Sequence, residues 1–299
     1  MSGAIASVLR AFEEADLVCL GEAHELQEAA DFLAALLREP GFAGAVNDIV
    51  VECGNSMHQE VADRFTAGED VPPADLLALW RDTTQPAAWD SPIYGQLFVR
   101  VREANRDLAP ERRIRVLLAD PPIQWNRVRT AAELAPFAAL REAHMAAVIE
   151  AQVLRKGRKA LFWAGASHVV RQPVTVPNPV VLTEKRGSGR VYVILTHTGF
   201  AEDQLETRLT AWPAPSLLRL EGTWLGRLDA ASYFRHVRGR NPYAGLRLAD
   251  MADAYLYFGP PGELTWRPAP DDIYGGEYGA EVERRRKLIA GLAGLVGKF

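Results

Sequence analysis

An apolar run at residues 17–20 ends in Gly21-Glu22-Ala23-His24, and a helical pattern begins directly after it. A buried strand that leads through glycine into a helix is how α/β proteins present polar side chains at the carboxyl edge of a sheet. The pattern recurs at residues 161–164, where a second apolar run leads into Gly165-Ala166-Ser167-His168. Two strands that each end in Gly-x-x-His therefore favour an α/β fold with both histidines at one edge of the sheet.

Two further apolar runs end in a carboxylate, Glu52 in one case and Asp120 in the other. The carboxyl ends of parallel strands meet at the same edge of a sheet. We therefore expect a single site built from four strand ends, in which these two carboxylates join Glu22, His24 and His168.

The whole pattern predicts one α/β domain over residues 1–299. Amphipathic helical segments alternate with short apolar runs, which is typical of a mixed, mostly parallel central sheet with helices on both faces. Residues 187–189 predict a hairpin connection between two late strands. Beyond residue 200 the pattern weakens, so we expect an irregular C-terminal cap over the site at about 200–250. The expected strands are 16–20, 48–53, 114–119, 160–164, 179–183, 191–197 and 254–258.

Composition and charge argue against several classes of protein. The formal net charge is -4, so the chain lacks the excess of basic residues that is typical of nucleic-acid-binding proteins. Cys19 and Cys53 are too few for a disulfide framework and lie in or beside expected strands, so we expect free buried thiols. No segment is apolar over the length of a bilayer and no signal-peptide pattern opens the chain, which predicts a cytoplasmic protein without a membrane partner. The basic run at 284–287 lies beside Glu281 and Glu283 and favours a solvated helix face, with a phosphate or membrane contact as the minor alternative.

Other polar positions have ordinary structural interpretations. The loop at 80–95 mixes tryptophans with Pro, Thr and Asp, and is either a lid over the site or an irregular segment anchored to the core. His58 reads as a surface or capping residue and His197 as an interior or edge histidine. Arg141 and Glu142 lie on a long amphipathic pattern, where composition alone favours a solvated pair.

The side chains expected at the strand ends are suited to two kinds of chemistry. Two imidazoles with one to three carboxylates match the ligands of a divalent metal such as Zn, Mn, Co or Fe. They also match metal-free acid–base catalysis, in which a carboxylate orients a histidine that activates water. The chain has no Gly-x-Ser-x-Gly elbow, no P-loop and no Gly-x-Gly-x-x-Gly after a strand. These absences argue against serine hydrolases and nucleotide-binding folds.

The chain resembles the superfamily of erythromycin esterases, ChaN-like haem-binding lipoproteins, and Tiki and TraB proteins. This resemblance implies an α/β fold with a mixed central sheet. One residue separates Glu22 from His24, which is the ChaN-like spacing, whereas the esterases have two. The motifs that carry the resemblance are Leu20-Gly21-Glu22-Ala23-His24, Val51-Glu52, Arg141-Glu142, Met145-Ala146, Gly165-Ala166-Ser167-His168 and Asp253-Ala254-Tyr255-Leu256-Tyr257.

The resemblance also implies roles for individual residues. By similarity to the esterases, His24 activates water with help from Glu22, Glu52 and Arg141, and His168 lies alongside. By similarity to Tiki proteins, a metal is held by both histidines and one of the two glutamates. By similarity to ChaN, either histidine is an axial haem ligand. The metal-ligand candidates are His24, His168, Glu22 and Glu52, followed by Asp120 and Glu142.

The leading functional hypothesis is a hydrolase of an ester, lactone or amide bond in a small molecule or peptide, with or without a metal. One alternative is a haem or metal-ligand binding protein of the ChaN-like type. Another is a non-hydrolytic acid–base enzyme of natural-product biosynthesis, and a third is a protein that keeps the fold without catalysis. The sequence leaves the substrate and the oligomeric state open.

Overall fold

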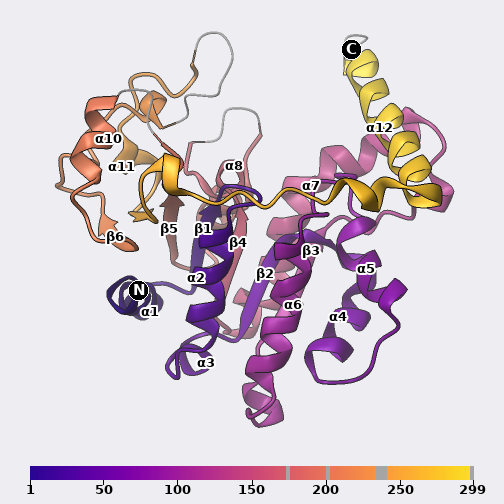
Figure 1. The fold of residues 1–299 in the computed structure, drawn as a ribbon, viewed down its shortest axis with the longest axis horizontal. Helices are drawn as coiled ribbons and strands as arrows, with labels where there is room; N and C mark the ends of the chain where they lie inside the picture. The colour runs from indigo at the N-terminus through magenta and orange to yellow at the C-terminus, as the bar shows by residue number, and fades with distance from the viewer. Residues whose placement is uncertain (173–175, 200–202, 234–240, 297–299) are drawn as a thin grey trace.

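The structure, a computed structural model, describes residues 1–172, 176–199, 203–233 and 241–296. Within this part, a seven-stranded sheet crosses the molecule in the order β3-β2-β4-β1-β5-β7-β6 (Figure 1). All neighbouring strands are parallel except the edge strand β6, which is antiparallel to β7. This confirms the predicted mixed, mostly parallel sheet. The strands are β1 (Leu17–Glu22), β2 (Asp48–Asn55), β3 (Arg115–Asp120), β4 (Ala160–Gly165), β5 (Val191–Thr196), β6 (Ser216–Arg219) and β7 (Ala254–Tyr257).

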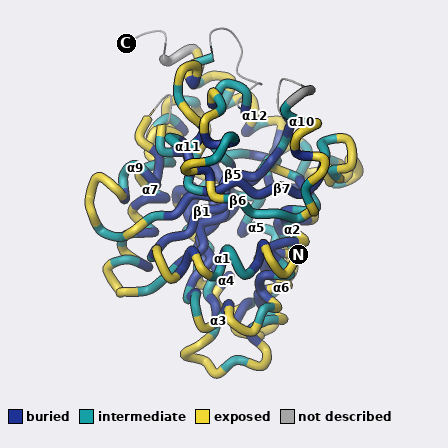
Figure 2. Tube along the Cα trace, turned by 90° about the vertical axis from the view of Figure 1, so that its left-hand side faces the viewer, coloured by how far each residue is buried: buried dark blue, intermediate teal, exposed yellow. Residues whose placement is uncertain are grey.

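Helices cover both faces of the sheet, as predicted, because alternate strand residues point to opposite sides. Val18 and Leu20 of β1 join one core, while Leu17 and Cys19 join the other. Figure 2 shows the strands buried between these layers. The first core holds α1 (Ser2–Glu14), α2 (Gln27–Leu37), α3 (Phe42–Ala45), α4 (Gln59–Thr66), α5 (Pro73–Arg81) and α6 (Pro92–Asn105). The second holds α7 (Ala131–Gln152), α8 (Ala166–Val169), α9 (Pro179–Arg186), α10 (Asp203–Leu209) and α11 (Leu248–Met251).

The last helix, α12 (Gly276–Val296), packs beside α7 around a third, smaller apolar cluster. Leu288, Ile289 and Leu292 of α12 contact Trp125 and its neighbours there. In the part of the chain described, no helix combines the length and the hydropathy needed to cross a membrane.

The predicted strand at 179–183 is wrong, because this segment forms helix α9. The side chain of Asn178 accepts a hydrogen bond from the Val181 N–H at 3.1 Å, and Pro179 occupies the first helical turn. Gly187 ends the helix with φ of 63°, so residues 187–189 are a helix end and not a hairpin. A short apolar run cannot be assigned to strand or helix by periodicity, and the Asn-Pro start signal was the informative feature here.

The late part of the chain contains one strand that the pattern did not predict, β6, whose residues are half-buried or exposed at the sheet edge. The predicted strand at 254–258 is confirmed as β7. The described residues between 203 and 250 pack on this end of the sheet; for example, the Tyr233 hydroxyl donates to the Thr196 carbonyl at 2.8 Å. Residues 200–202 and 234–240 of the expected cap lie outside the described part. The capping role of 200–250 stays a prediction.

A different segment borders the loop that carries His24. The Gln27 N–H donates to the Thr265 carbonyl at 2.9 Å, and the Arg267 N–H donates to the Glu25 carbonyl at 2.8 Å. Figure 1 shows this segment leading on to α12. Residues near 265 therefore lie against the first Gly-x-x-His loop.

Cys19 and Cys53 are both free and buried, as predicted. Burial raises the pKa of each thiol above its ordinary value, because the thiolate would lose its hydration. The two cysteines therefore act as small core residues, not as nucleophiles.

The amino edge of the sheet holds a buried charge of its own. Asp48 at the start of β2 is fully buried and accepts hydrogen bonds from Arg115 Nε at 2.7 Å and from Arg158 Nε at 2.7 Å. The side chains of Arg115 and Arg158 are 33% and 28% exposed. This carboxylate ties β2 to β3 and to the residues that precede β4.

We expect Asp48→Ala to lower the free energy of unfolding by about 3 kcal/mol, because it leaves two partly buried guanidinium groups without their acceptor. Urea titration measures the change. The matched control is Glu103→Ala, which breaks an ion pair whose two side chains are 45% exposed. That change should cost less than about 1 kcal/mol. Equal losses in the two variants would contradict the assignment.

Candidate active site

The four strands whose carboxyl ends were expected to form a site are neighbours in the sheet, in the order β3-β2-β4-β1. The two Gly-x-x-His motifs lie on adjacent strands, and Glu22 pairs in register with Gly165. The absence of a side chain at Gly165 is required, because a Cβ there would lie 2.9 Å from His24 Cε1 and 3.2 Å from Glu52 Oε1. The strand ends therefore bring both motifs and Glu52 into contact.

Glu22 and His24 form a pair in which the carboxylate is buried and the imidazole is about half exposed. Glu22 Oε1 lies 3.0 Å from His24 Nδ1, and the side chain of His24 is 46% exposed against 2% for Glu22. The Tyr94 hydroxyl donates to the same oxygen at 3.3 Å. The second oxygen, Glu22 Oε2, is buried without a hydrogen-bond partner. This arrangement orients the ring and leaves His24 Nε2 directed away from Glu22.

The pKa values of both groups in this pair are raised. Burial raises the pKa of Glu22 to about 7, against the opposing effect of the hydrogen bond with His24. Burial lowers the pKa of His24, but the hydrogen bond with Glu22 and the charge of Glu52 outweigh it, so the pKa is raised above 6.5. Because the two groups are in contact, they titrate as a coupled pair.

Glu52 lies at the centre of the site and is 1% exposed. Its Oε1 accepts a hydrogen bond from the Gly165 N–H at 2.7 Å. Its Oε2 lies 2.8 Å from His168 Nε2 and 3.2 Å from Arg141 Nη2. Burial alone raises the pKa of Glu52, but the positive charges of His168 and Arg141 outweigh it and hold the pKa well below its usual range. Glu52 is therefore ionised at all relevant pH values.

His168 lies between two carboxylates. Its Nε2 contacts Glu52, and its Nδ1 lies 2.7 Å from Glu142 Oε1, a distance that makes an ion pair although the geometry is not that of a hydrogen bond. Burial lowers the pKa of His168, but the charges of Glu52 and Glu142 raise it to about 9. The imidazolium form therefore prevails at neutral pH, and the 3.0 Å contact between Arg141 Nη1 and His168 Nε2 brings two cations together. Glu52 compensates both of them.

Arg141 and Asp120 form the third part of the site. Arg141 Nε donates to Asp120 Oδ1 at 3.1 Å. Asp120 is fully buried and also accepts from the Thr84 N–H at 2.6 Å and the Thr84 hydroxyl at 2.7 Å. Asp120 thus holds Arg141 and does not contact either histidine. The interpretation of Arg141 and Glu142 as a solvated pair is wrong, because their side chains are only 12% and 19% exposed and turn from α7 into the site.

Two aromatic residues complete the surroundings of His24; both belong to the loop at 80–95 that the sequence marked as aromatic, but neither was among the predicted site residues. The Trp89 ring is 2% exposed and packs edge-to-face with His24 at 4.8 Å between centroids. Tyr94 is fully buried and also accepts a hydrogen bond from the Glu25 N–H. Both follow the polar turn of the loop at 80–95, which is buried at Thr83, Thr84, Trp89, Asp90 and Ser91. Burial at these positions anchors the loop to the core, while Trp89 of the same loop packs against His24. A role as a lid stays a prediction.

The histidines outside the site have other partners. His197 is fully buried and bonded to the Tyr255 hydroxyl at 2.7 Å and to Glu206 at 3.1 Å, which confirms an interior histidine. His58 lies 3.5 Å from Asp82. His144 Nε2 lies 2.9 Å from the Ser56 hydroxyl, so this side chain of α7 has a different partner from Arg141.

Three of the expected metal ligands offer donor atoms at one place. One oxygen or nitrogen each of Glu22, His24 and Glu52 lies within 4.8 Å of the others. Among the described residues this donor set leaves out His168, whose two nitrogens face Glu52 and Glu142 instead. Asp120 and Glu142 are also outside it.

No protein-family profile and no curated protein sequence matches the chain. Solved structures do match it. A mutant of erythromycin esterase EreC in its open conformation superposes with a TM-score of 0.57 and 15% identity, over 86% of this chain and 93% of that one. A succinoglycan biosynthesis protein superposes with a TM-score of 0.58 and 11% identity, over 85% of this chain and 90% of that one.

ChaN of Campylobacter jejuni, solved with cofacial haem, matches with a TM-score of 0.43 and 15% identity, over 66% of this chain and 87% of that one. So low a score supports no inference about haem. The identities are at most 15% in these three cases, so the likeness concerns the fold. The expected resemblance to erythromycin esterases is confirmed at this level, and the chain is similar in fold to erythromycin esterase EreC.

Proposed function

We propose that the protein is a hydrolase of an ester, lactone or amide bond in a small molecule or peptide. The observation that carries the proposal is the 3.0 Å contact between the buried carboxylate of Glu22 and Nδ1 of the half-exposed His24. A buried carboxylate that orients an accessible imidazole is the arrangement of a general base. The fold likeness to an esterase supports the same reaction class by analogy.

In this mechanism His24 Nε2 takes a proton from water as the water oxygen attacks the carbonyl carbon of the substrate. The tetrahedral intermediate then collapses, the C–O or C–N bond breaks, and His24 Nε2 returns the proton to the alcohol or amine that leaves. The proton on Nδ1 remains hydrogen-bonded to Glu22, so the imidazolium that forms lies against a negative charge. Tyr94 and Trp89 keep the ring in place through the 3.3 Å hydrogen bond to Glu22 and the 4.8 Å edge-to-face contact with His24. A fixed ring reduces the cost of orienting the water for attack.

Arg141 and the imidazolium of His168 stabilise the negative charge that develops on the carbonyl oxygen. They lie within 3.2 Å of Glu52 and are almost buried, where positive charge acts more strongly than in water. Glu52 keeps both cations in place, and Asp120 fixes the second side of the guanidinium. The same residues would serve a non-hydrolytic acid–base reaction, so the assay includes elimination and cyclisation products.

We expect His24→Ala to lower kcat/KM by on the order of 10²- to 10⁴-fold on any ester or lactone that the wild-type protein turns over, because the general base is lost. Glu22→Gln should lower it at least about tenfold, since the amide no longer stabilises the imidazolium. Rates are measured on a panel of lactones, esters and short peptides.

The matched control is His144→Gln, a substitution on α7 whose side chain contacts Ser56 instead of the site. This variant should keep the wild-type rate. Full activity in a folded His24→Ala protein would end the proposal.

The dependence of kcat/KM on pH should be bell-shaped. Activity rises as the Glu22/His24 pair loses its proton at a pKa above 6.5, and it falls as His168 loses its proton near a pKa of 9. The raised pKa of His168 also affects the stability of the fold. The protonated imidazole contributes fully to the free energy of unfolding below pH 6.5, and this contribution is lost as the pH rises through 9. His168→Gln should remove the alkaline limb of the rate profile.

The pKa of each histidine is measured directly by NMR of the ring protons, which requires no substrate. His168→Gln assigns the signal. A His168 signal that titrates at or below pH 6.5 would show that the two carboxylates do not hold the proton.

A metal-assisted form of the reaction is the second candidate, favoured by the donor atoms of Glu22, His24 and Glu52 within 4.8 Å and by the unpartnered oxygen Glu22 Oε2. These residues fit a divalent ion, although Glu52 would have to share oxygens that Gly165, Arg141 and His168 already contact. A bound ion would polarise the carbonyl or lower the pKa of a water molecule.

For this candidate we expect one equivalent of Zn, Mn, Co or Fe in the purified wild-type protein, measured by elemental analysis. The metal should be lost in His24→Ala and retained in His168→Ala, because His168 lies outside the donor set. A wild-type protein without metal after reconstitution rules this candidate out and leaves direct acid–base chemistry. Haem binding stays a prediction, tested by the appearance of a Soret band on titration with haem.

A further inference from the structure

A cavity of about 630 Å³ lies outside the described catalytic arrangement, between α12 and the segment at residues 123–129. Its size is that of pockets that hold small organic molecules. Four segments that are distant in the sequence form its walls. Its lining includes Met57, Asp82, Trp125, Arg129, Arg284 and Arg285.

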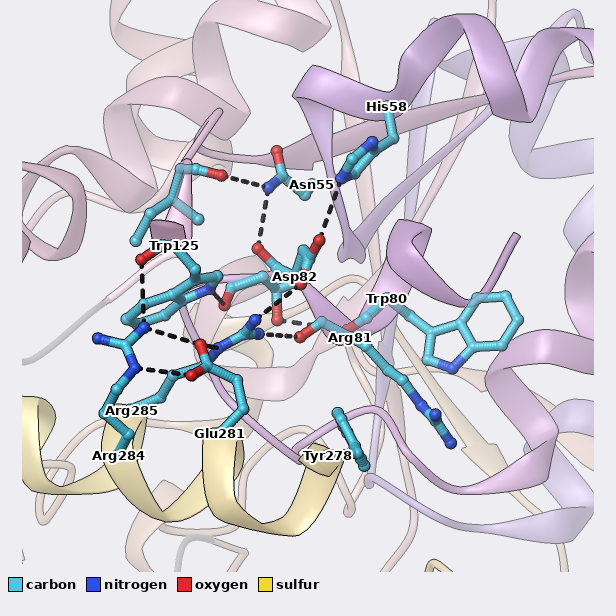
Figure 3. A network of polar contacts seen from close by, with 12 residues as sticks. Asn55, His58, Trp80, Arg81, Asp82, Trp125, Tyr278, Glu281, Arg284 and Arg285 are labelled. Carbon is cyan, nitrogen blue, oxygen red and sulfur yellow. Dashed lines mark hydrogen bonds and ion pairs between the residues drawn. The ribbon is translucent and has the colours of Figure 1, made fainter. Parts of the chain in front are cut away.

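The guanidinium groups of α12 are fixed in this wall by hydrogen bonds. Arg284 donates to the carbonyls of Val128 at 2.7 Å and Trp125 at 3.1 Å, and twice to Glu281. Arg285 donates to Glu281, to the Arg81 carbonyl and to Asp82. Figure 3 shows both guanidinium groups held beside Trp125 and Glu281. The prediction of a solvated helix face is therefore wrong for Arg285, which is 6% exposed.

Not all donors of these groups are used. A guanidinium carries five N–H donors. Four hydrogen bonds from Arg284 leave it one donor, and three from Arg285 leave it two. A cavity wall with prearranged, unfilled donors binds carboxylate or phosphate oxygens at little entropic cost.

The charge of the lining is positive. Two carboxylates, Asp82 and Glu281, face three guanidinium groups, those of Arg129, Arg284 and Arg285. Both carboxylates already accept hydrogen bonds from arginines of α12. The exposed guanidinium of Arg129, in contrast, makes no hydrogen bond within the described residues. The charge of Glu133 lies near Arg129. Arg129 is thus the cation of this cavity that is left to pair with an anionic ligand.

An apolar surface faces the same cavity. Met57 is a large apolar side chain that is 40% exposed, and it lines the cavity together with the buried residues Ile123 and Val128. We propose that this cavity binds a small organic anion, with its carboxylate or phosphate group at Arg129 and the free donors of Arg284 and Arg285, and its apolar part against Met57.

The cavity is distinct from the catalytic arrangement but shares its framework. Asn55, three residues after Glu52 on β2, donates to the carbonyls of Asp82 and Ile123, both at 2.9 Å. The proposal does not depend on hydrolase activity, because it concerns binding alone. A failure of either idea leaves the other intact.

The test is isothermal titration calorimetry of the full chain with phenyl phosphate, benzoate and benzyl alcohol. At least one of the two anions should bind at about 1 mM or below. Arg129→Gln should weaken that binding about tenfold, because it removes a charge-assisted contact. The stronger anion identifies the head group, and added salt should weaken its binding.

Arg127→Gln is the matched control, since Arg127 is an exposed arginine two residues away that does not line the cavity. It should leave the affinity unchanged. The proposal is overturned if neither anion binds, if benzyl alcohol binds as tightly as the anions, or if Arg127→Gln weakens binding as much as Arg129→Gln. Circular dichroism checks that both variants are folded.

Discussion

Glu52 places an ionised carboxylate in the buried interior at the carboxyl edge of the sheet, just beyond the last residue of β2 that pairs with β4. An unpaired charge there would cost on the order of several kcal/mol. The surrounding residues are arranged to compensate it. The Gly165 N–H takes one oxygen at 2.7 Å, and His168 and Arg141 take the other at 2.8 and 3.2 Å. Because those two cations repel one another, their position depends on the same carboxylate. The candidate site is thus a charge cluster whose members hold each other.

The cluster also explains why the two Gly-x-x-His motifs differ in role. His24 lies at the open side and remains 46% exposed; its Nδ1 lies 3.0 Å from Glu22 Oε1, and its Nε2 lies 3.7 Å from Glu52 Oε1. His168 lies inside, with a carboxylate at each nitrogen and 12% of its side chain exposed. One histidine is therefore suited to exchange protons with a ligand, and the other to remain charged. A shared motif does not give a shared function when burial and neighbouring charges differ.

The loop between α5 and α6 connects the site to the C-terminal helix. Trp89 of this loop packs on His24. The neighbouring Asp90 accepts hydrogen bonds from the Tyr278 hydroxyl at 2.7 and 2.8 Å, and Tyr278 lies under the Arg81 guanidinium at 4.1 Å. The end of the chain thus reinforces the surroundings of a residue near its beginning. The same helix closes the arginine-lined cavity.

Sequence alone determined the elements that depend on local pattern. Apolar runs that end in Gly-x-x-His, Glu52 or Asp120 identified four strands and placed their polar residues at one sheet edge, because parallel strands align their carboxyl ends. The prediction from sequence failed at 179–183, because the periodicity of a short apolar run does not distinguish a strand from a helix. Only the tertiary structure decided that the four strands are neighbours and that Arg141 points inward. It also decided that Asp120 holds Arg141 instead of a histidine, and that Trp89 and Tyr94 flank His24. These outcomes depend on pairing and burial between separate segments, which lie 21 residues apart for Asp120 and Arg141 and 72 apart for Tyr94 and Glu22, and no local pattern encodes such contacts.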